Sequence, residues 1–199
     1  PALQDGLFEL GGRKVGLVGY GAVPKLLAPV LQALGCEVLY TARAPKPEAI
    51  GAFRPLEALL AESDVVSLHI PETAETRGLI NAAAIARMKP GAVFVNNARG
   101  TVVDLEALAR ALQDGHVLGA AVDVFPVEPS RNGEAFVSPL QGIPTAILTP
   151  HIGGSTGEAQ SRIGQEVARK LIDFSDTAAT FGAVNFPQVQ LPARPSGAR

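Results

Sequence analysis

The amino-acid sequence predicts an α/β fold with a doubly wound parallel sheet. Short runs rich in Val, Ile and Leu alternate with helical stretches along the 199 residues, and hydrophobic residues make up 47% of the chain. Charged residues make up only 18%, below the roughly 25% typical of soluble domains, which indicates a large buried share. Parallel strands covered by helices on both faces have such apolar runs, and the crossover between them is usually a helix.

The predicted elements follow one another in a regular order. Strands are expected at residues 14–18, 38–40, 65–68, 92–95, 117–122 and 146–148. Helical stretches are expected to start near Val23, Pro55, Asn81 and Asp104, and a long one follows Ser155. Asn81 and Asp104 are good N-cap residues. Six strands are too few for an eight-stranded barrel, which leaves the open sheet.

The first predicted strand runs directly into a glycine turn. The segment Val18-Gly19-Tyr20-Gly21-Ala22-Val23-Pro24 precedes an apolar helical pattern. Gly19 permits the tight turn, Gly21 lets a pyrophosphate approach the backbone, and the helix N-terminus supplies N–H groups and a positive dipole. A dinucleotide site is favoured over a structural turn because the glycines stand between a strand and a helix.

Two prolines depart from the usual pattern of such a turn. Pro24 stands where the motif has its third small residue, and the first turn of a helix tolerates proline there. Pro29 lies five residues further on and removes a backbone hydrogen bond. We therefore expect the first helix to be irregular.

The end of the second strand lacks the acid that is expected about 20 residues after the glycine turn to hold the adenosine ribose. The stretch Tyr40-Thr41-Ala42-Arg43 has no carboxylate, and Glu37 opens the strand at the other sheet edge. Thr41 and Arg43 instead suit a ribose 2′-phosphate, because a guanidinium matches phosphate geometry. Either NAD or NADP remains possible as the cofactor, and these residues favour NADP. The alternative interpretation is that Arg43 is a solvated loop residue that does not bind the cofactor.

Polar groups follow three other predicted strands. Arg99, Glu128 and His151 come after the strands at 92–95, 117–122 and 146–148. Carboxyl ends of parallel strands meet at one sheet edge, where open sheets bind their ligands. Oxidation of a 2-hydroxy acid by a nicotinamide needs an arginine for the substrate carboxylate, a histidine for the hydroxyl proton and a carboxylate that holds the imidazole. His69 ends another strand at this edge, where it either lines the adenosine site or is a structural histidine.

These segments resemble the D-isomer-specific 2-hydroxyacid dehydrogenase family, and within it the phosphoglycerate dehydrogenases most closely. The matching stretches are NARGTVVD at 97–104, GAAVDVFPVEP at 119–129, LTPHIGGST at 148–156, SLHIP at 67–71 and AVNFP at 183–187. The resemblance implies a Rossmann-type NAD(P)-binding domain and the oxidation of a D-2-hydroxy acid. The favoured substrate is 3-phosphoglycerate, and the implied pathway is serine biosynthesis. It also implies that Arg99 binds the substrate carboxylate, that Glu128 pairs with His151 and that His151 transfers the proton.

Further cofactor contacts are implied by the same resemblance. They are Ala22, Val23, Pro71, Asn97, Ala98, Arg99, Asp123, His151, Gly153 and Gly154, which join Gly19, Gly21, Thr41, Arg43 and His69 as candidate cofactor-binding residues. The family usually has a carboxylate at the place of Ala42, so that contact does not carry over. The stretch at 40–43 is more similar to the NADP-using glyoxylate and hydroxypyruvate reductases, and nucleotide-sensing corepressors keep the same catalytic triad. Both classes remain alternatives.

The resemblance also predicts the domain organisation. Residues 1–187 are expected to form the NAD(P)-binding domain and residues 188–199 a linker, with the substrate and regulatory domains absent from this chain. An isolated chain of this kind should be inactive. We expect a homodimer built on the surface of the nucleotide domain, with the apolar segments 100–103 and 136–140 as candidates.

Composition excludes several classes of partner. Lys and Arg number 17 against 19 for Asp and Glu, and no basic run is long enough to follow a phosphate backbone. No stretch approaches the ~18 apolar residues of a membrane span. Cys36 is the single cysteine, and with three histidines it makes no metal cluster. We therefore expect a cytoplasmic protein with a small-molecule substrate and without a metal, a membrane or nucleic acid.

Overall fold

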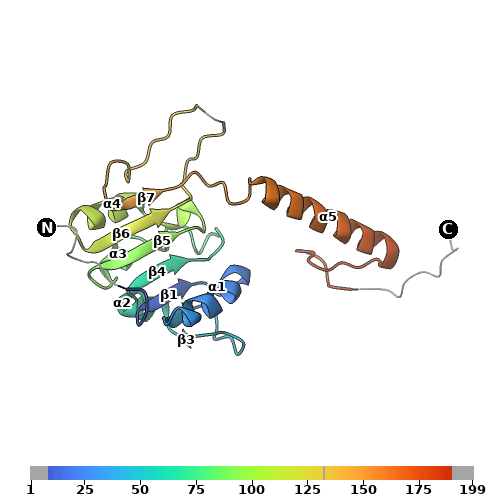
Figure 1. The fold of residues 1–199 in the computed structure, drawn as a ribbon, viewed down its shortest axis with the longest axis horizontal. Helices are drawn as coiled ribbons and strands as arrows, with labels where there is room; N and C mark the ends of the chain where they lie inside the picture. Colours follow the sequence, from blue (N-terminus) through green and yellow to red (C-terminus); the bar gives the residue numbers. More distant parts are fainter. Residues whose placement is uncertain (1–8, 132, 190–199) are drawn as a thin grey trace. The chain divides into compact units, whose positions relative to one another are not determined.

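The computed structural model describes residues 9–131 and 133–189. They divide into two compact units, one that ends at Pro150 and one that begins at His151, and each is described by itself. The first unit contains the sheet and the second a long helix (Figure 1). Within the described ranges, no helix has the length and apolar character needed to cross a membrane. The same ranges hold no group of His, Cys, Asp and Glu that could bind a metal ion.

The described part of the first unit is built on a parallel sheet of seven strands, in the order β3-β2-β1-β4-β5-β6-β7. The strands are β1 (Lys14–Val18), β2 (Glu37–Thr41), β3 (Ala52–Phe53), β4 (Val65–Leu68), β5 (Ala92–Asn96), β6 (Val117–Val122) and β7 (Ala146–Leu148). The chain moves outward from β1 to β3 and then returns to continue from β4 to β7. Between β1 and β4 the strand order reverses, and a doubly wound sheet opens its ligand crevice at such a point. The predicted fold class is confirmed.

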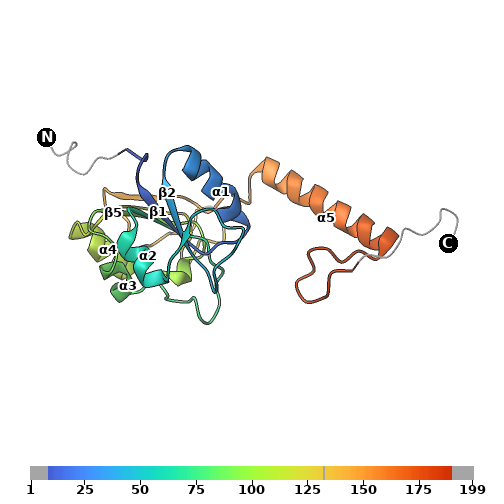
Figure 2. The same cartoon turned by 90° about the horizontal axis from the view of Figure 1, so that it is seen from below.

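Helices cover both faces of this sheet. They are α1 (Ala22–Ala33), α2 (Leu56–Glu62), α3 (Ala82–Ala86), the 3-10 turn η1 (Gly100–Val102) and α4 (Leu105–Gln113). Figure 2 shows α1 on one side of the sheet and α2, α3 and α4 on the other. The predicted N-caps are confirmed, because the Asn81 side chain accepts a bond from the Ala84 N–H (3.0 Å) and Asp104 from the Ala107 N–H (2.9 Å).

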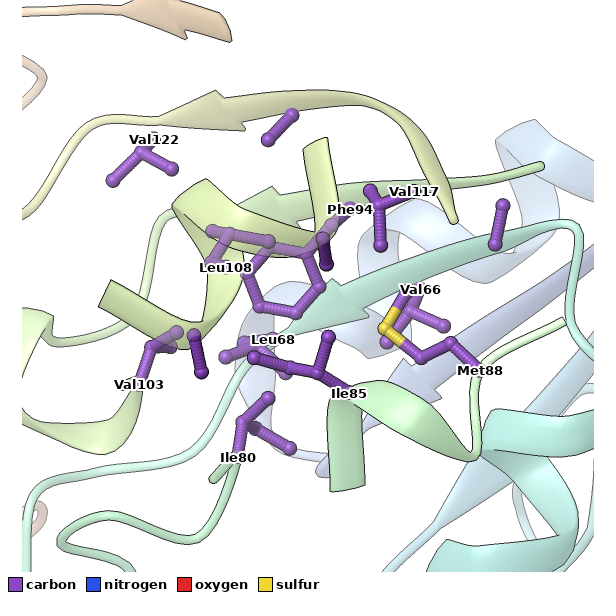
Figure 3. Close-up of a cluster of buried hydrophobic side chains, with 14 of the residues drawn as sticks. Val66, Leu68, Ile80, Ile85, Met88, Phe94, Val103, Leu108, Val117 and Val122 are labelled. Atoms are coloured by element: carbon purple, nitrogen blue, oxygen red, sulfur yellow. The ribbon is translucent and has the colours of Figure 1, made fainter. Parts of the chain in front are cut away.

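Each face of the sheet has its own apolar cluster. The larger one packs α2, α3 and α4 against the sheet, and Phe94 of β5 lies within it beside Leu108 and Ile85 (Figure 3). Phe94 and Leu108 have no exposed surface. The smaller cluster, under α1, includes Leu31, Tyr20 and Tyr40. Both clusters hold the strand ends of the first unit in place through burial of apolar surface.

Two details differ from the sequence expectations, namely β3 and the segment 100–103. β3 was not predicted, because two residues carry no detectable alternation. Pro29 lies inside α1, which continues to Ala33, and the irregularity expected of this helix remains a prediction. The segment 100–103 is wrong as dimer surface, since Val102 and Val103 are buried within the unit itself. In the segment 136–140, Leu140 is buried in the same way, whereas Val137 is exposed.

The outer side of α1 carries a different apolar stripe. Its members are Val23, Leu26, Val30 and Leu34, and each is more than half exposed. Their spacing of three or four residues places them on one helical face. The stripe is therefore a continuous apolar surface of the first unit.

The second unit is dominated by α5 (Gly157–Thr177). The Thr156 side chain caps it by accepting a bond from the Ala159 N–H, at 3.2 Å. Its apolar residues recur at helical spacing, but none of its residues is buried. Beyond the helix, Thr180 pairs with Val189 through its N–H and its hydroxyl. Most of the predicted linker, from residue 190 on, lies outside the described residues.

Candidate functional site

A cavity of about 600 Å³ lies beside β1, β4 and β5, and its lining extends from the turns that follow these strands along α1 to Val15, Leu31 and Val65. It lies at the point where the strand order reverses, as the fold predicts. Its lining includes many of the predicted cofactor residues: Gly21, Ala22, Val23, His69, Pro71, Asn97, Ala98 and Arg99. The structure thus brings three separate turns of the first unit to one site.

The two glycines of the first turn have different roles. Gly19 has a φ of +100°, and a Cβ added there would lie 2.6 Å from the His69 carbonyl oxygen. Gly21 has an ordinary φ of −96°, and a Cβ added there would meet no described atom within 4 Å. The protein itself therefore requires glycine at position 19, whereas at position 21 the absence of a side chain leaves open space in the cavity.

The N-terminus of α1 borders this open space. Among the described residues, no side chain caps it, so the N–H groups of its first turn stay available to an anionic ligand. Pro24 is buried in that turn and lines the cavity. It contributes no N–H, so an anion here would be bound by the donors that precede it.

Thr41 and Arg43, which were predicted to bind the cofactor, do not line the cavity. The carbonyl of Thr41, at the end of β2, accepts a bond of 3.0 Å from the N–H of Gly19. Arg43 is exposed in the loop that follows. The pKa of Glu75 is lowered, mainly by a hydrogen bond from Thr73, and the positive charge of Arg43 adds to this effect. The charge of Arg43 therefore acts on the segment that follows β4, where the cavity is lined by Pro71.

His69 is hydrogen-bonded and also lines the cavity, and its contact with an adenosine remains a prediction. Its Nε2 lies 2.9 Å from the hydroxyl of Ser67, which gives the imidazole a hydrogen-bond partner. It also lines the cavity. Burial lowers the pKa of His69 below its ordinary value, because desolvation disfavours the charged imidazolium. A neutral imidazole is therefore presented to the cavity at neutral pH.

The turn that carries Arg99 is held by a buried amide. Asn96 has no exposed surface, and its side chain accepts a bond from the Ala98 N–H (3.0 Å) and donates one to the Arg99 carbonyl (3.1 Å). The Arg99 side chain is exposed and lines the cavity. Asn96 was not among the predicted site residues, although a polar side chain at the end of a buried strand is a signal for such a role.

This turn packs directly on the loop that follows β6. A Cβ added at Gly100 would lie 2.0 Å from the carbonyl carbon of Phe125 and 2.4 Å from the nitrogen of Pro126. In that loop, Glu128 accepts a bond of 2.9 Å from the Phe125 N–H. The backbone contact therefore joins the turn of Arg99 to the loop of Glu128.

Asp123 lies at the start of the same loop. Its N–H donates to the carbonyl of Asn96 (3.0 Å), and its carboxylate accepts a bond from the Thr149 hydroxyl at 2.5 Å. The end of β6 is thus tied on one side to the Arg99 turn and on the other to the end of β7. This places Asp123 at the sheet edge predicted for it.

His151, Gly153 and Gly154 belong to the second unit. His151 is exposed and has a positive φ of 52°, which is uncommon for a residue other than glycine. A Cβ added at Gly153 or Gly154 would meet no described atom within 4 Å. The pairing of His151 with Glu128 remains a prediction.

The chain matches a known family over most of its length. Residues 3–153 match the sequence profile described as D-isomer specific 2-hydroxyacid dehydrogenase, NAD binding domain. The chain is 50% identical over 189 residues to D-3-phosphoglycerate dehydrogenase of Haemophilus influenzae, covering 94% of this chain and 46% of the relative. It is 48% identical over 193 residues to the Escherichia coli K12 protein of the same name, covering 96% and 47%. The chain thus spans about half the length of these relatives.

Solved structures show the same fold. The TT0316 protein of Thermus thermophilus is 42% identical, with a TM-score of 0.73 over 83% of this chain and 51% of that protein. The NAD complexed form of a D-isomer specific 2-hydroxyacid dehydrogenase from Lactobacillus delbrueckii ssp. bulgaricus is 29% identical, with a TM-score of 0.77 over 84% and 54%. A glyoxylate reductase from Paecilomyes thermophila is 32% identical, with a TM-score of 0.76 over 93% and 54%.

Proposed function

The chain belongs to the D-isomer specific 2-hydroxyacid dehydrogenase family, whose NAD binding domain it matches, and from this premise we propose that it binds a nicotinamide dinucleotide and supplies side chains for oxidation of a D-2-hydroxy acid. The names of the relatives support 3-phosphoglycerate as the substrate and serine biosynthesis as the pathway. When bound, the nicotinamide supplies the hydride acceptor.

One observation carries the proposal of cofactor binding. At Gly21 an added Cβ would meet nothing within 4 Å, at the N-terminus of a helix that no described side chain caps. A pyrophosphate fits both features, since it needs close approach to the backbone and N–H donors. The residues present therefore fit the diphosphate of a dinucleotide.

The test replaces Gly21 by alanine. We expect the stability of this variant to stay within about 0.5 kcal/mol of the parent, because the added methyl group finds free space. Its affinity for NADH or NADPH should fall on the order of tenfold or more, because the methyl group occupies the place of the pyrophosphate. Gly164→Ala is the matched control, since its Cβ would also meet nothing within 4 Å but it lies within α5. Calorimetric titration that finds equal affinities for parent and Gly21→Ala would contradict the proposal.

The catalytic roles divide among three side chains. Arg99 pairs with the substrate carboxylate, for which a guanidinium has matching bidentate geometry. His151 takes the hydroxyl proton, and Glu128 orients its imidazole and favours the charged form. The bracing of Arg99 through Asn96 and of Glu128 through the Phe125 N–H supports these roles.

Turnover is expected to need more than the present chain. The relatives are about twice as long, and hydride transfer requires a substrate held about 3 to 3.5 Å from the nicotinamide in a site without water. Residues 1–199 alone should bind cofactor and show negligible dehydrogenase activity. In the full-length protein, His151→Ala should abolish turnover while cofactor affinity is largely kept, as measured by nicotinamide absorbance.

We further propose a preference for NADP over NAD. Position 42 is alanine, which removes the repulsion that a carboxylate would exert on a 2′-phosphate, and Arg43 follows it in an exposed loop. Arg43→Ala is expected to lower the ratio of NADPH to NADH affinity by about fivefold, since one solvated pair contributes about 1 kcal/mol. An unaltered ratio would contradict the preference.

A second candidate substrate is glyoxylate or hydroxypyruvate, favoured by the same loop and by the similarity to a glyoxylate reductase. Rates of the full-length protein with 3-phosphoglycerate, glyoxylate and hydroxypyruvate distinguish the candidates.

The free, buried thiol of Cys36 supports a reducing cytoplasm as the compartment.

A homodimer is proposed, with the segment 136–140 as its candidate surface, because Val137 in it is largely exposed. An exposed apolar side chain of this size is typical of a surface that a second copy covers. Val137→Glu should then convert a dimer to a monomer in light scattering, and Lys25→Glu, on α1, should leave the mass unchanged. A monomeric parent at high concentration would contradict this proposal.

A further inference from the structure

The loop that joins β2 to β3, residues 42–51, is held by two tyrosine hydroxyl groups. The Tyr40 hydroxyl accepts a bond from the Lys46 N–H (2.9 Å) and donates one to the Lys46 carbonyl (3.2 Å). The Tyr20 hydroxyl accepts a bond from the Ile50 N–H (2.7 Å) and lies 3.4 Å from the Ile50 carbonyl. Each hydroxyl thus binds the backbone of one residue of this loop.

The two rings are themselves firmly placed. Tyr20 and Tyr40 are only 4% and 3% exposed, and their ring centroids are 4.7 Å apart. Tyr40 also makes an edge contact with Phe53 of β3, at 5.7 Å. Buried aromatic pairs of this geometry add stability beyond their area. The packing of the two rings therefore fixes the positions of their hydroxyl groups.

The positions of the two tyrosines link two parts of the candidate cofactor site. Tyr20 stands between Gly19 and Gly21 in the glycine turn, and Tyr40 stands on β2, at the start of the stretch that leads to Arg43. The loop is also closed at its end, where a Cβ added at Gly51 would lie 2.4 Å from the Val38 carbonyl oxygen. The shape of the loop is thus coupled to the turn proposed for the pyrophosphate.

We infer that Tyr20 and Tyr40 are positioning residues for the cofactor, because their hydroxyl groups hold the 42–51 loop in the shape that receives the ribose 2′-phosphate. This inference rests on the proposed NADP preference. A loop that is already ordered loses less conformational entropy when a ligand binds, which raises affinity without any new contact. The two hydroxyl groups act through the loop and need not touch the nucleotide.

Replacement of tyrosine by phenylalanine isolates the hydroxyl groups. The rings keep their packing in Tyr40→Phe and Tyr20→Phe, while the Lys46 or Ile50 N–H loses its acceptor. We expect NADPH affinity to fall on the order of tenfold in each variant, because an unpaired backbone donor drives the loop away from this shape. NADH affinity should fall by less than about threefold, because NADH has no 2′-phosphate for the loop to hold.

The control variant must also remove a buried hydroxyl group, but one that lies away from the 42–51 loop. Ser63 has no exposed surface, and its hydroxyl donates to the Leu59 carbonyl at 2.6 Å, just before β4 begins and so at the other sheet edge. Ser63→Ala should lower stability without a change in the ratio of NADPH to NADH affinity. Calorimetric titration of both cofactors against the full-length protein, its two tyrosine variants, Ser63→Ala and Arg43→Ala measures every ratio, and circular dichroism verifies folding.

The outcomes separate the inference from the proposal beneath it. A lowered ratio in Arg43→Ala and in both tyrosine variants, with Ser63→Ala unchanged, supports both. A lowered ratio in Arg43→Ala alone overturns the positioning role. A lowered ratio in the tyrosine variants alone supports the positioning role and overturns the part of Arg43 in the proposed preference. Equal ratios in all variants, or the same loss in Ser63→Ala as in the tyrosine variants, overturn the inference.

Discussion

A methyl group added at Gly21 would meet no described atom within 4 Å, whereas one added at Gly100 would lie 2.0 Å from the carbonyl carbon of Phe125. Both glycines stand in turns at the carboxyl edge of the same sheet. In the β1–β2 half, Gly19 packs against the backbone of His69, but position 21 leaves room beside the chain, whereas the β5–β6 half closes such room at Gly100 by direct backbone packing. The first half therefore suits a ligand that lies against the backbone, and the second suits one that exposed side chains bind.

The same contrast holds for the groups that support each half. In the β5–β6 half, the buried Asn96 amide holds the turn of Arg99 from within two or three residues. In the β1–β2 half, Tyr40 binds the loop backbone 6 residues away and Tyr20 binds it 30 residues away. Hydrogen bonds between residues two or three positions apart leave a turn little conformational freedom. Hydrogen bonds between residues further apart allow the conformation of the loop to change without loss of the fold.

The largest effect is expected from Gly100→Ala. The added Cβ must displace backbone atoms of Phe125 and Pro126, and overpacking of this kind costs about 3 kcal/mol of unfolding free energy. Denaturant titration measures this loss, with Gly21→Ala as the partner expected to change stability by less than about 0.5 kcal/mol. Equal stabilities of the two variants would remove the structural contrast between the two halves.

Asn96→Ala is expected to have the next largest effect. It leaves the buried Ala98 N–H without its acceptor, and the Arg99 carbonyl loses a donor as well. Such losses cost about 2 kcal/mol. Asn97→Ala is the matched control, because Asn97 is exposed, and its stability should stay within about 0.5 kcal/mol of the parent. In the full-length protein, Asn96→Ala should also raise the KM for the hydroxy acid, since Arg99 loses its support.

Much of this architecture follows from local sequence patterns. The apolar runs predicted every strand except β3, and Asn81 and Asp104 predicted helix starts through the short side chains that caps require. The glycine turn predicted a strand, a turn and a helix start in this order, because strand, glycines and helix are contiguous in sequence, and the structure has a cavity at the N-terminus of this helix. Contacts within a few residues leave such signals.

Contacts between segments that are far apart along the chain leave no such signal in the sequence. Nothing in the sequence around Gly100 indicates that Phe125 and Pro126 lie against it, and nothing around Tyr20 indicates its bond to Ile50, 30 residues away. For the same reason the sequence predicts a surface position for Val102 and Val103, which are apolar and outside the strands, although they fill the core. The supports of a site depend on which segments the sheet brings together, and only the folded structure specifies that.

The smallest effect is expected from His69, which follows β4 between the two halves. Burial lowers its pKa below the ordinary value of 6.5, so below that pH the unfolded chain binds a proton more readily than the folded one does. Stability is then fully present above pH 6.5 and declines as the pH falls toward the lowered pKa of the folded state. His69→Asn cannot titrate, so the dependence of its unfolding free energy on pH between 7.5 and 5.5 should be shallower than that of the parent. Denaturant titrations at several pH values measure both slopes. Equal slopes would mean that the pKa of His69 is the same in the folded and the unfolded protein, so that burial beside the cavity has no effect on the charge of its imidazole.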